Sequence, residues 1–571
     1  MLTNLSYLKS LNKVILSFEY NKEIIDDIKE SFPWTERKWD AIGKQWTITH
    51  TILNQNRVKE FLDRWSFKAQ TSASDESKSE SNINSYLKNK SRLNQLKSYK
   101  NDIGKIDSQI RPYPYQVEGI NAMCSWSRMI NGDDVGCGKS PQTIFTAEVM
   151  NYFPCLLICP SCTKYQWKEL WQRVNPNRTI SIIESDDKNK DWSADVVIIN
   201  YDILGEKEIL DEEGKWKAKS RYRELLTNKW EYVVFDEIHK LKNVKSLRSK
   251  SAKLIVKNIP NRHGLTGTLV ENKPVELVNP LMLIGVFNDV FGNWSSFTDR
   301  YCDSKRTRYG LDVSGASNTL ELNKLLRATC YIRREKRDVL KDLPPIQTSI
   351  LNIDISNKKE YLKAEDKFIE YLTENYSKQK VDSAMMAEFL VQRNHLRQLS
   401  LKGKIKGIEQ WLEDFMEQSD EKVLVVGNFR EPLETLAINF DSELIDGSKN
   451  AFEKRDLIKK WSTNKKQFLL GNIAAIGTGT DGLQDNCNTL VICDLPEKPS
   501  TLDQLIGRLE RIGQKNAISV YFLLSKETID MKLWEAIEFK RKITEAVNKG
   551  KDVGTQKSID DLIAQSYLKR V

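Results

Sequence analysis

Histidine is scarce in this sequence, with four residues among 571. A metal centre built on imidazole ligands is therefore not expected. The nine cysteines are scattered. The one close pair, Cys159 and Cys162, has no second pair or nearby histidine that would complete a metal site. We interpret all nine as reduced thiols in a cytoplasmic protein.

Long apolar runs are also missing. No stretch is long enough to span a bilayer, and no signal peptide is recognised, so we expect no membrane association. Hydrophobic residues make up 40% of the chain and charged residues 29%, an ordinary balance for a globular protein. The length predicts three or four domains. The net charge of +9 permits a polyanionic partner, although a lysine-rich solvated surface explains it equally well.

The most informative stretch is a glycine-rich turn from Asp133 to Ser140, which ends in Lys-Ser and enters a helical pattern. This is the layout of a phosphate-binding loop, because backbone N–H groups and the helix N-terminus converge on phosphate oxygens. Lys139 would reach the β- and γ-phosphates, and the Ser140 hydroxyl would bind Mg²⁺. Asp133 occupies the place of the usual first glycine, so the motif alone leaves room for chance. The other loop residues expected to line the nucleotide are Asp134, Gly136 and Gly138.

Short, continuous apolar runs follow the loop. Residues 156–159, 196–199 and 232–235 indicate buried parallel strands separated by helical patterns, which predicts a doubly wound α/β domain. The third run leads directly into Asp236 and Glu237, at the strand end where such sheets bind ligands. Asp236 would hold Mg²⁺ through water, and Glu237 would orient and deprotonate the attacking water.

Another set of apolar runs, at residues 423–426, 468–470, 490–493 and 520–524, predicts a second α/β domain. Within it, Arg508 and Arg511 are three residues apart in a helical pattern and would share one face. Such a pair can reach the γ-phosphate across a cleft and stabilise the charge of the transition state.

These motifs resemble those of the SWI/SNF-like branch of superfamily-two helicases, over residues 111 to about 530. The matching segments are 159–161 with Trp167 (motif Ia), 236–243 (motif II), 265–272 (motif III), 333–345 (lobe connection), 477–483 (motif V) and 504–514 (motif VI). The resemblance implies two RecA-like doubly wound parallel-sheet lobes with a helical insertion between them. It also implies DNA-dependent ATP hydrolysis with ATP and Mg²⁺. Gln116 would read the adenine, and Gln504 would belong to the nucleotide site.

The sequence departs from the family pattern at several places. Glu510 stands where the family commonly has histidine, and residues 483–485 read Leu-Gln-Asp in place of Leu-Asn-Leu. Ser140 replaces the commoner threonine and keeps the hydroxyl. We expect Glu510 to alter how hydrolysis is coupled to movement, without abolishing nucleotide binding.

The resemblance also places DNA contacts around Ser161 in motif Ia, Lys242 and Asn243 after motif II, and Thr480 in motif V. Because phosphate contacts would dominate, we expect weak sequence preference and steep salt dependence.

Residues 1–67 predict a small α+β module with a strand at 14–18, a helix at 22–32 and an aromatic hairpin around Trp39 and Trp46. A tryptophan mini-core explains the aromatics without any ligand. Alternatively, Arg37, Lys38 and Lys44 form a basic rim for DNA. The stretch resembles the HARP module that accompanies annealing helicases, which implies action on forked DNA.

The predicted domains are a HARP-like DNA-binding module (1–67), a flexible linker (68–104), an ATP-binding lobe (105–345), a helical insertion (346–402), a second lobe (403–530) and a helical tail (531–571). Residues 556–563 have the spacing of a sliding-clamp peptide, although an ordinary amphipathic helix explains them better.

The pattern as a whole predicts an ATP-dependent double-stranded DNA translocase. It would remodel or anneal forked or branched DNA in replication, repair or recombination, with a sliding clamp or a single-strand-binding protein as further partners. The alternatives are a remodeller of protein–DNA complexes, for example one that displaces RNA polymerase, a nuclease or restriction subunit, and a binding module with a dead ATPase. We expect a nucleoid-associated bacterial or viral protein, or a nuclear one if the source is eukaryotic.

Overall fold

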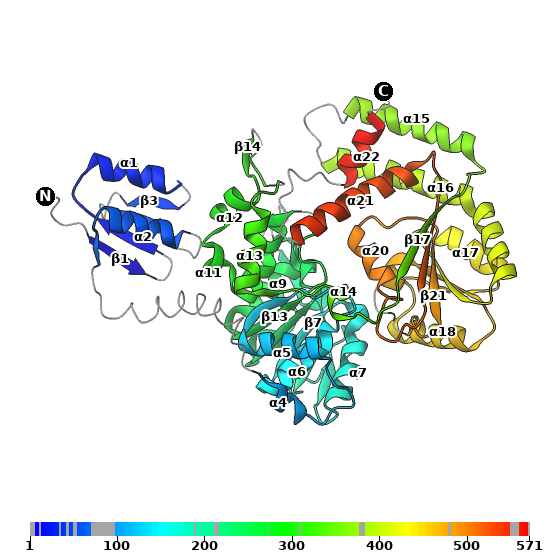
Figure 1. The fold of residues 1–571 in the computed structure, drawn as a ribbon, viewed down its shortest axis with the longest axis horizontal. Helices are drawn as coiled ribbons and strands as arrows, with labels where there is room; N and C mark the ends of the chain where they lie inside the picture. Colours follow the sequence, from blue (N-terminus) through cyan, green and yellow to red (C-terminus); the bar gives the residue numbers. More distant parts are fainter. Residues whose placement is uncertain are drawn as a thin grey trace.

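The computed structural model describes residues 6–10, 13–33, 36–40, 45–49, 54–69, 98–187, 190–209, 216–271, 273–307, 310–313, 315–375, 383–477, 480, 482–548 and 559–568. Two α/β lobes lie next to each other, and a small α+β module precedes them in the chain (Figure 1). The fold predicted from the sequence is therefore confirmed. Among the described helices, none is both long and apolar enough to cross a membrane.

Lobe 1 is built on a seven-stranded sheet in which all neighbouring strands are parallel, in the order β16-β6-β13-β12-β7-β9-β8. Alternate residues supply two apolar cores: Leu156 and Ile158 face one, and Leu157 and Cys159 face the other. The strands are β6 (Arg128–Asn131), β7 (Cys155–Cys159), β8 (Ile180–Ile182), β9 (Val196–Asn200), β12 (Tyr232–Asp236), β13 (Asn261–Leu265) and β16 (Tyr331–Ile332). The three predicted strands correspond to β7, β9 and β12.

Helices cover both faces of this sheet, so most of its strand residues are buried, including polar ones such as Asn131 of β6 and His263 of β13. They are α4 (Lys100–Gly104), α5 (Pro114–Ser125), α6 (Lys139–Met150), α7 (Lys164–Val174), α8 (Glu224–Thr227), α9 (Leu247–Ile255), α10 (Val278–Ile284), α11 (Phe287–Phe291), α12 (Trp294–Tyr301), α13 (Thr319–Thr329) and α14 (Lys336–Val339). Two hairpins extend from the lobe, β10 (Gly205–Ile209) with β11 (Trp216–Ser220) and β14 (Lys305–Thr307) with β15 (Gly310–Asp312).

Lobe 2 has a six-stranded parallel sheet in the order β17-β22-β21-β18-β20-β19. Its strands are β17 (Ile346–Asn352), β18 (Lys422–Gly427), β19 (Glu443–Ile445), β20 (Phe468–Asn472), β21 (Cys487–Ile492) and β22 (Ile518–Leu524). The predicted start of the helical insertion at residue 346 is therefore wrong, because β17 pairs with β22 along its whole length. As an edge strand, β17 is largely exposed and polar, so its apolar signal is weak.

The helical segment between the lobes consists of α15 (Lys358–Asn375) and α16 (Ser383–Gln418). Helix α16 continues past the predicted boundary at residue 402, and its residues Leu401, Ile408 and Leu412 are buried against the lobe 2 sheet. The insertion is thus continuous with lobe 2. The remaining lobe 2 helices are α17 (Arg430–Asn439), α18 (Ala451–Thr463), α19 (Ile473–Gly477) and α20 (Pro499–Ile506).

The C-terminal segment is helical, as predicted, with α21 (Ile529–Asn548) and α22 (Ile559–Leu568). Helix α21 returns from lobe 2 towards α13 of lobe 1 (Figure 1). Ile563 and Tyr567 of α22 are fully buried, and the Tyr567 ring lies 5.3 Å from that of Phe368 in α15. In this conformation α22 forms part of the lobe 2 core and does not present the suggested clamp peptide, whose residues 556–558 lie outside the described part.

The N-terminal module is a five-stranded sheet in the order β3-β4-β2-β1-β5 with two helices. Its elements are β1 (Ser6–Ser10), β2 (Lys13–Ser17), α1 (Lys22–Ser31), β3 (Arg37–Asp40), β4 (Gln45–Thr49), α2 (Gln55–Arg64) and β5 (Lys68–Ala69). The predicted aromatic hairpin is present: Trp39 pairs with Trp46 across β3 and β4, with ring centroids 5.4 Å apart.

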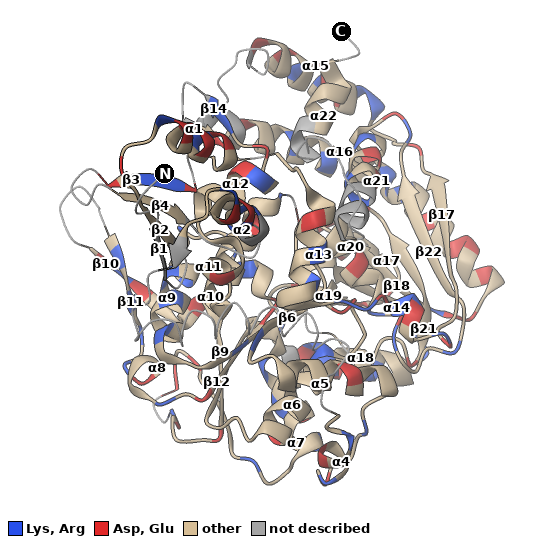
Figure 2. Ribbon diagram, turned by 60° about the vertical axis from the view of Figure 1, so that its left-hand side comes forward, with Lys and Arg blue, Asp and Glu red and all other residues tan. Residues whose placement is uncertain are grey.

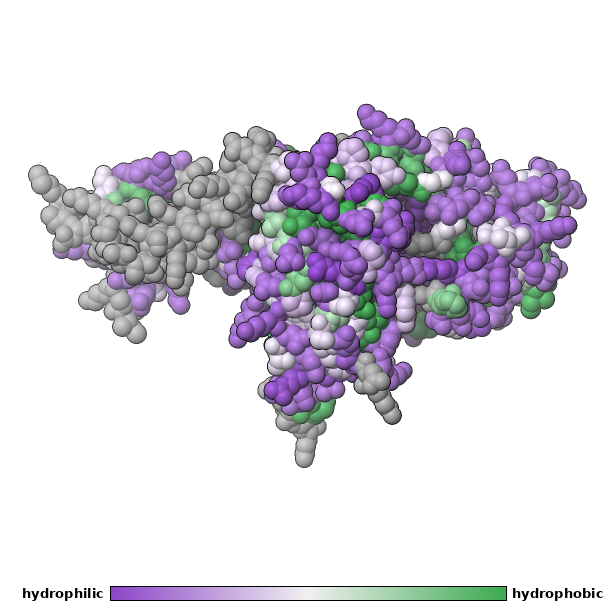
Figure 3. Space-filling model, turned by 90° about the horizontal axis from the view of Figure 1, so that it is seen from below, coloured by the Kyte–Doolittle hydropathy of each residue, from purple (hydrophilic) through white to green (hydrophobic). Residues whose placement is uncertain are grey.

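Charged residues of both signs are intermingled over both lobes (Figure 2). The face seen in Figure 3 is mainly hydrophilic, with apolar residues in small patches. In Figure 2, Lys and Arg are therefore not gathered in a single block.

Candidate active site between the two lobes

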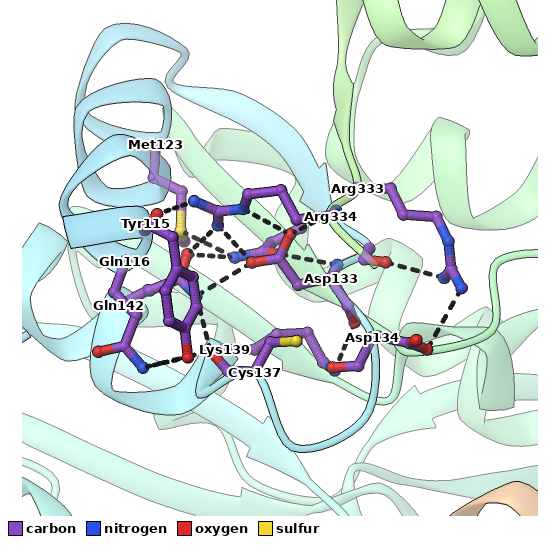
Figure 4. Close-up of polar contacts among 12 residues, drawn as sticks. Tyr115, Gln116, Met123, Asp133, Asp134, Cys137, Lys139, Gln142, Arg333 and Arg334 are labelled. Carbon is purple, nitrogen blue, oxygen red and sulfur yellow. Dashed lines mark hydrogen bonds and ion pairs between the residues drawn. The ribbon is translucent and has the colours of Figure 1, made fainter. Parts of the chain in front are cut away.

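The phosphate loop leads into helix α6, as predicted, and it follows strand β6, which the sequence did not indicate. Gly136 and Gly138 have φ angles of 91° and 74°, in the left-handed region that favours glycine. A Cβ on Gly138 would lie 2.2 Å from Nε2 of Gln116, so this position also has no space for a side chain. Lys139 donates to the carbonyl oxygens of Asp133 (2.8 Å) and Asp134 (3.2 Å), and so folds back over its own loop (Figure 4).

Gln116, the predicted adenine reader, contacts the loop itself. Its Nε2 donates to the carbonyl oxygen of Cys137 (3.2 Å), and its Oε1 accepts from the backbone N–H of Tyr113 (3.0 Å). The side chain is almost fully buried. Gln116 therefore lies beside the nucleotide loop, and adenine recognition remains a prediction. Ser140, the predicted Mg²⁺ ligand, is the second residue of α6.

Asp133, which replaces the usual glycine, is fully buried. Nε of Arg334 and Nε2 of Gln142 each donate to its carboxylate at 3.0 Å, and a second guanidinium nitrogen of Arg334 forms an ion pair with it (Figure 4). Arg333 donates to the carbonyl oxygens of Gly132 (3.0 Å) and Gly267 (2.9 Å). The segment after β16 thus clamps the phosphate loop, a role that the sequence analysis missed because it assigned these arginines only to the lobe connection.

Of the two predicted carboxylates, Asp236 is the last residue of β12 and Glu237 follows it directly. The Asp236 carboxylate accepts from the Trp167 indole N–H (2.9 Å), and Glu237 lies 3.2 Å from Nδ1 of His239. Burial and the adjacent charge of Glu237 raise the pKa of Asp236. Burial also raises the pKa of Glu237, but His239 and the charge of Lys139 outweigh it and lower this pKa. Glu237 therefore stays ionised, as a group that orients water must.

A divalent cation fits this arrangement, because Asp236 and Glu237 bring two adjacent carboxylates together and the charge of Glu237 raises the pKa of Asp236. Asp236 and the hydroxyl of Ser140 are the residues that would hold Mg²⁺. No group of three His, Cys, Asp or Glu side chains suited to a metal occurs among the described residues.

Motif VI of lobe 2 lies against the phosphate loop. A Cβ on Gly507 would come within 3.1 Å of Cγ1 of Val135. Arg508, however, donates to the carbonyl oxygens of Gly477 (2.6 Å) and Thr480 (2.9 Å). Arg511 donates to the Gly507 carbonyl (3.0 Å). Both arginines therefore contact carbonyls of their own lobe, and their role as arginine fingers remains a prediction.

A polar cleft of about 420 Å³ lies between the lobes, bordered by His239, Lys242 and Glu271 on one side and by Lys498 and Gln504 on the other. Nζ of Lys242 lies 2.5 Å from Glu271 and 3.0 Å from Glu276, and Lys498 reaches Glu271 at 3.3 Å. Lys242, a predicted DNA contact, is therefore held in an ion-pair network in this structure. Gln504 lines the same cleft.

The other predicted DNA contacts differ in exposure. Ser161 and Asn243 are exposed. Thr480 is buried, and its hydroxyl donates to the Ile476 carbonyl (2.6 Å). Lys44 lies outside the described residues.

Arg37 also has a structural role that the sequence did not suggest, and its contact with DNA remains a prediction. Its guanidinium donates to the carbonyl oxygens of Ile28 (3.4 Å), Lys29 and Phe32 at the end of α1. The Phe32 backbone N–H also donates to the Ile28 carbonyl (3.1 Å), and Arg37 adds a side-chain donor to this group of carbonyls as a C-terminal cap.

The two lobes match two family models in sequence. Residues 61–403 match the SNF2-related domain, and residues 403–513 match the helicase conserved C-terminal domain.

Curated proteins with similar sequences were also found. The chain is 27% identical over 455 residues to SWI/SNF-related matrix-associated actin-dependent regulator of chromatin subfamily A-like protein 1 of Xenopus tropicalis, covering 77% of this chain and 46% of that protein. It is 25% identical over 456 residues to DNA annealing helicase and endonuclease ZRANB3 of Homo sapiens, covering 77% and 40%. The chain spans less than half the length of these relatives.

Among solved structures, the Sulfolobus solfataricus SWI2/SNF2 ATPase core in complex with dsDNA matches at 22% identity and a TM-score of 0.36, covering 78% of this chain and 94% of that one. The SNF2-related domain alone covers more than half of the present sequence. The chain therefore belongs to the SNF2-related family, and its two matched domains imply ATP hydrolysis.

Proposed function

We propose that this protein is a DNA-dependent ATPase that translocates on double-stranded DNA and remodels or anneals forked or branched DNA. The observation that carries the proposal is the contact between Gly507 of motif VI and Val135 of the phosphate loop. Because the two lobes meet at the loop itself, a change in the nucleotide alters the lobe interface directly, which is the requirement for a motor.

The chemistry follows from the residues around the loop. Lys139 leaves the carbonyls of Asp133 and Asp134 and binds the phosphates of ATP, while Glu237 orients and deprotonates the attacking water. Mg²⁺, when bound by Asp236 and Ser140, neutralises phosphate charge. Arg508 and Arg511 must leave the carbonyls of Gly477, Thr480 and Gly507 before they can reach the γ-phosphate.

Two features support forked DNA as the substrate. One relative is named as a DNA annealing helicase, and the N-terminal module resembles the module that accompanies such enzymes. Within this module Lys38 and Trp39 are exposed on β3, beside the capping residue Arg37. Lys38 is thus available to a phosphate, and the Trp39 ring is available to stack on a base.

The first test is the ATPase rate of the full chain without nucleic acid and with single-stranded DNA, duplex DNA, a forked duplex or RNA. Stimulation by duplex and fork DNA is expected. Stimulation by RNA alone, or by none of the four, would contradict the assignment. Deleting residues 1–67 should then reduce annealing on forks while sparing duplex-stimulated ATPase.

The second candidate is a remodeller of protein–DNA complexes, which the relative named as a regulator of chromatin favours. A duplex blocked by a bound protein such as a stalled RNA polymerase separates the two. ATP-dependent removal of the block without annealing of forked strands would favour the remodeller.

A further inference from the structure

Lys336, at the start of α14, joins the phosphate loop to motif VI of lobe 2. Its Nζ lies 2.7 Å from the Glu510 carboxylate and 3.0 Å from the Glu510 carbonyl oxygen. The Lys336 side chain is only 7% exposed and that of Glu510 only 17%. Water screens this pair weakly, so a change in the nearby charge acts on it strongly.

The same lysine lies directly on the phosphate loop. A Cβ on Gly136 would be 3.1 Å from Cε of Lys336 and 3.4 Å from its Nζ. The Lys336 backbone N–H also points to the Asp134 carboxylate (3.4 Å), which accepts from Arg333 as well (3.3 Å). The backbone of Lys336 therefore stays with the loop, and its long side chain is the part that can change partner.

The neighbouring arginines of motif VI are engaged elsewhere, on carbonyls of lobe 2. Glu510 follows Leu509 and immediately precedes Arg511, so a shift of Glu510 also moves the arginines. The ion pair with Lys336 depends on the carboxylate of Glu510.

We propose that Lys336 is a positioning residue that couples the nucleotide state to the lobe arrangement. Without nucleotide, its ammonium group binds Glu510 and holds motif VI in the arrangement seen here. The phosphates of ATP bring more negative charge to the loop than one carboxylate offers, and they attract the same ammonium group. Glu510 is then released, and repulsion between its carboxylate and the phosphates turns motif VI so that Arg508 and Arg511 can approach.

The test uses the full chain, Mg²⁺ and the fluorescent analogue mant-AMPPNP, with no DNA. Glu510→Gln should bind the analogue roughly fivefold more tightly, because the carboxylate that competes with the phosphates for Lys336 is gone and only the backbone carbonyl oxygen of position 510 remains as its partner. Lys336→Gln should bind it roughly fivefold more weakly. An ion pair with only a structural role would move both affinities in the same direction, because both variants break the same contact.

Arg455→Gln is the matched control. Arg455 of lobe 2 pairs with Glu169 of lobe 1 at 2.7 Å, away from the loop and half exposed, so this variant also loses a contact between the lobes. Its affinity for the analogue should stay within about twofold of wild type. If the two test variants change the affinity for the analogue in the same direction, or do not change it, the coupling role of Lys336 alone is overturned. Failure of the wild-type chain to bind the analogue overturns the nucleotide site itself.

Discussion

Arg334 and Asp133 form a buried ion pair behind the phosphate loop, although 201 residues separate them in the sequence. The aspartate stands where a phosphate loop usually has its first glycine, and the arginine belongs to the segment that leads to lobe 2. The shape of the loop therefore depends on the connection between the lobes.

Replacing Asp133 should consequently destabilise lobe 1. Asp133→Ala leaves Arg334 without its carboxylate, and we expect a loss of about 3 kcal/mol in the free energy of unfolding. Urea denaturation followed by tryptophan fluorescence measures it. Asp133→Asn, which keeps the shape and one acceptor oxygen, should lose less. Asp133→Gly restores the usual loop residue, so unchanged stability in this variant would contradict the role of the pair.

Glu237→Gln tests the predicted general base. The substitution keeps the size of the side chain but removes its ability to accept a proton, so we expect kcat for ATP hydrolysis to fall by at least about 100-fold. Nucleotide affinity should persist, because Lys139 and the loop are untouched. Glu206→Gln is the control, since Glu206 belongs to an exposed ion pair with Lys219 on the β10–β11 hairpin. A similar fall in both variants would argue against a role for Glu237 in the chemistry.

Arg37→Ala separates the capping role from the predicted DNA contact. Loss of the cap should lower the stability of the N-terminal module by about 1 kcal/mol. It should also weaken hydrogen-exchange protection in the last turn of α1. Lys38→Ala, at the exposed neighbouring position, should leave this protection unchanged. If Arg37→Ala keeps full protection and loses only DNA affinity, the interpretation from the sequence was right and the capping role is wrong.

His263 should make lobe 1 sensitive to acid. The ring is fully buried, Nδ1 lies 2.7 Å from the Tyr232 hydroxyl and Nε2 lies 2.7 Å from the Trp126 carbonyl oxygen. Burial lowers its pKa from 6.5 to about 4. Because the unfolded chain binds the proton more readily, the neutral ring stabilises the fold above pH 6.5, and this contribution is lost as the pH falls towards 4.

Between pH 7.5 and 5.5 the free energy of unfolding should fall by about 1.3 kcal/mol because of His263. Urea denaturation at the two pH values measures it against His263→Gln, which cannot be protonated in this range. The variant should be less stable at both pH values but should show a smaller difference between them. An equal pH dependence in the two proteins would assign the effect to other groups.

The local sequence pattern of apolar residues and glycines was sufficient to predict much of the architecture. Continuous apolar runs identified β7, β9 and β12, because parallel strands buried on both faces are usually apolar, whereas the interior strand β13 has buried polar residues and gave no such run. The edge strand β17 was missed for the opposite reason, since its side chains are largely exposed. The glycines of the phosphate loop were found because left-handed backbone angles limit which residues fit.

Contacts between side chains that are distant in the sequence could not be predicted from local patterns. Arg37 is a basic residue, so its side chain suggests a DNA contact. Only the position of β3 beside the end of α1 shows that it also caps that helix. Lys242 is likewise basic, but the fold brings Glu271 and Glu276 to it.

The sequence by itself determined the two α/β lobes, the phosphate loop and the order of the motifs, because periodicity and backbone constraints act over a few neighbouring residues. Only the tertiary structure decided the partners of the charged side chains: Asp133 with Arg334 and Lys336 with Glu510. The reason is physical: a charge binds whichever opposite charge the fold brings within a few ångströms, and distance along the chain does not enter that choice.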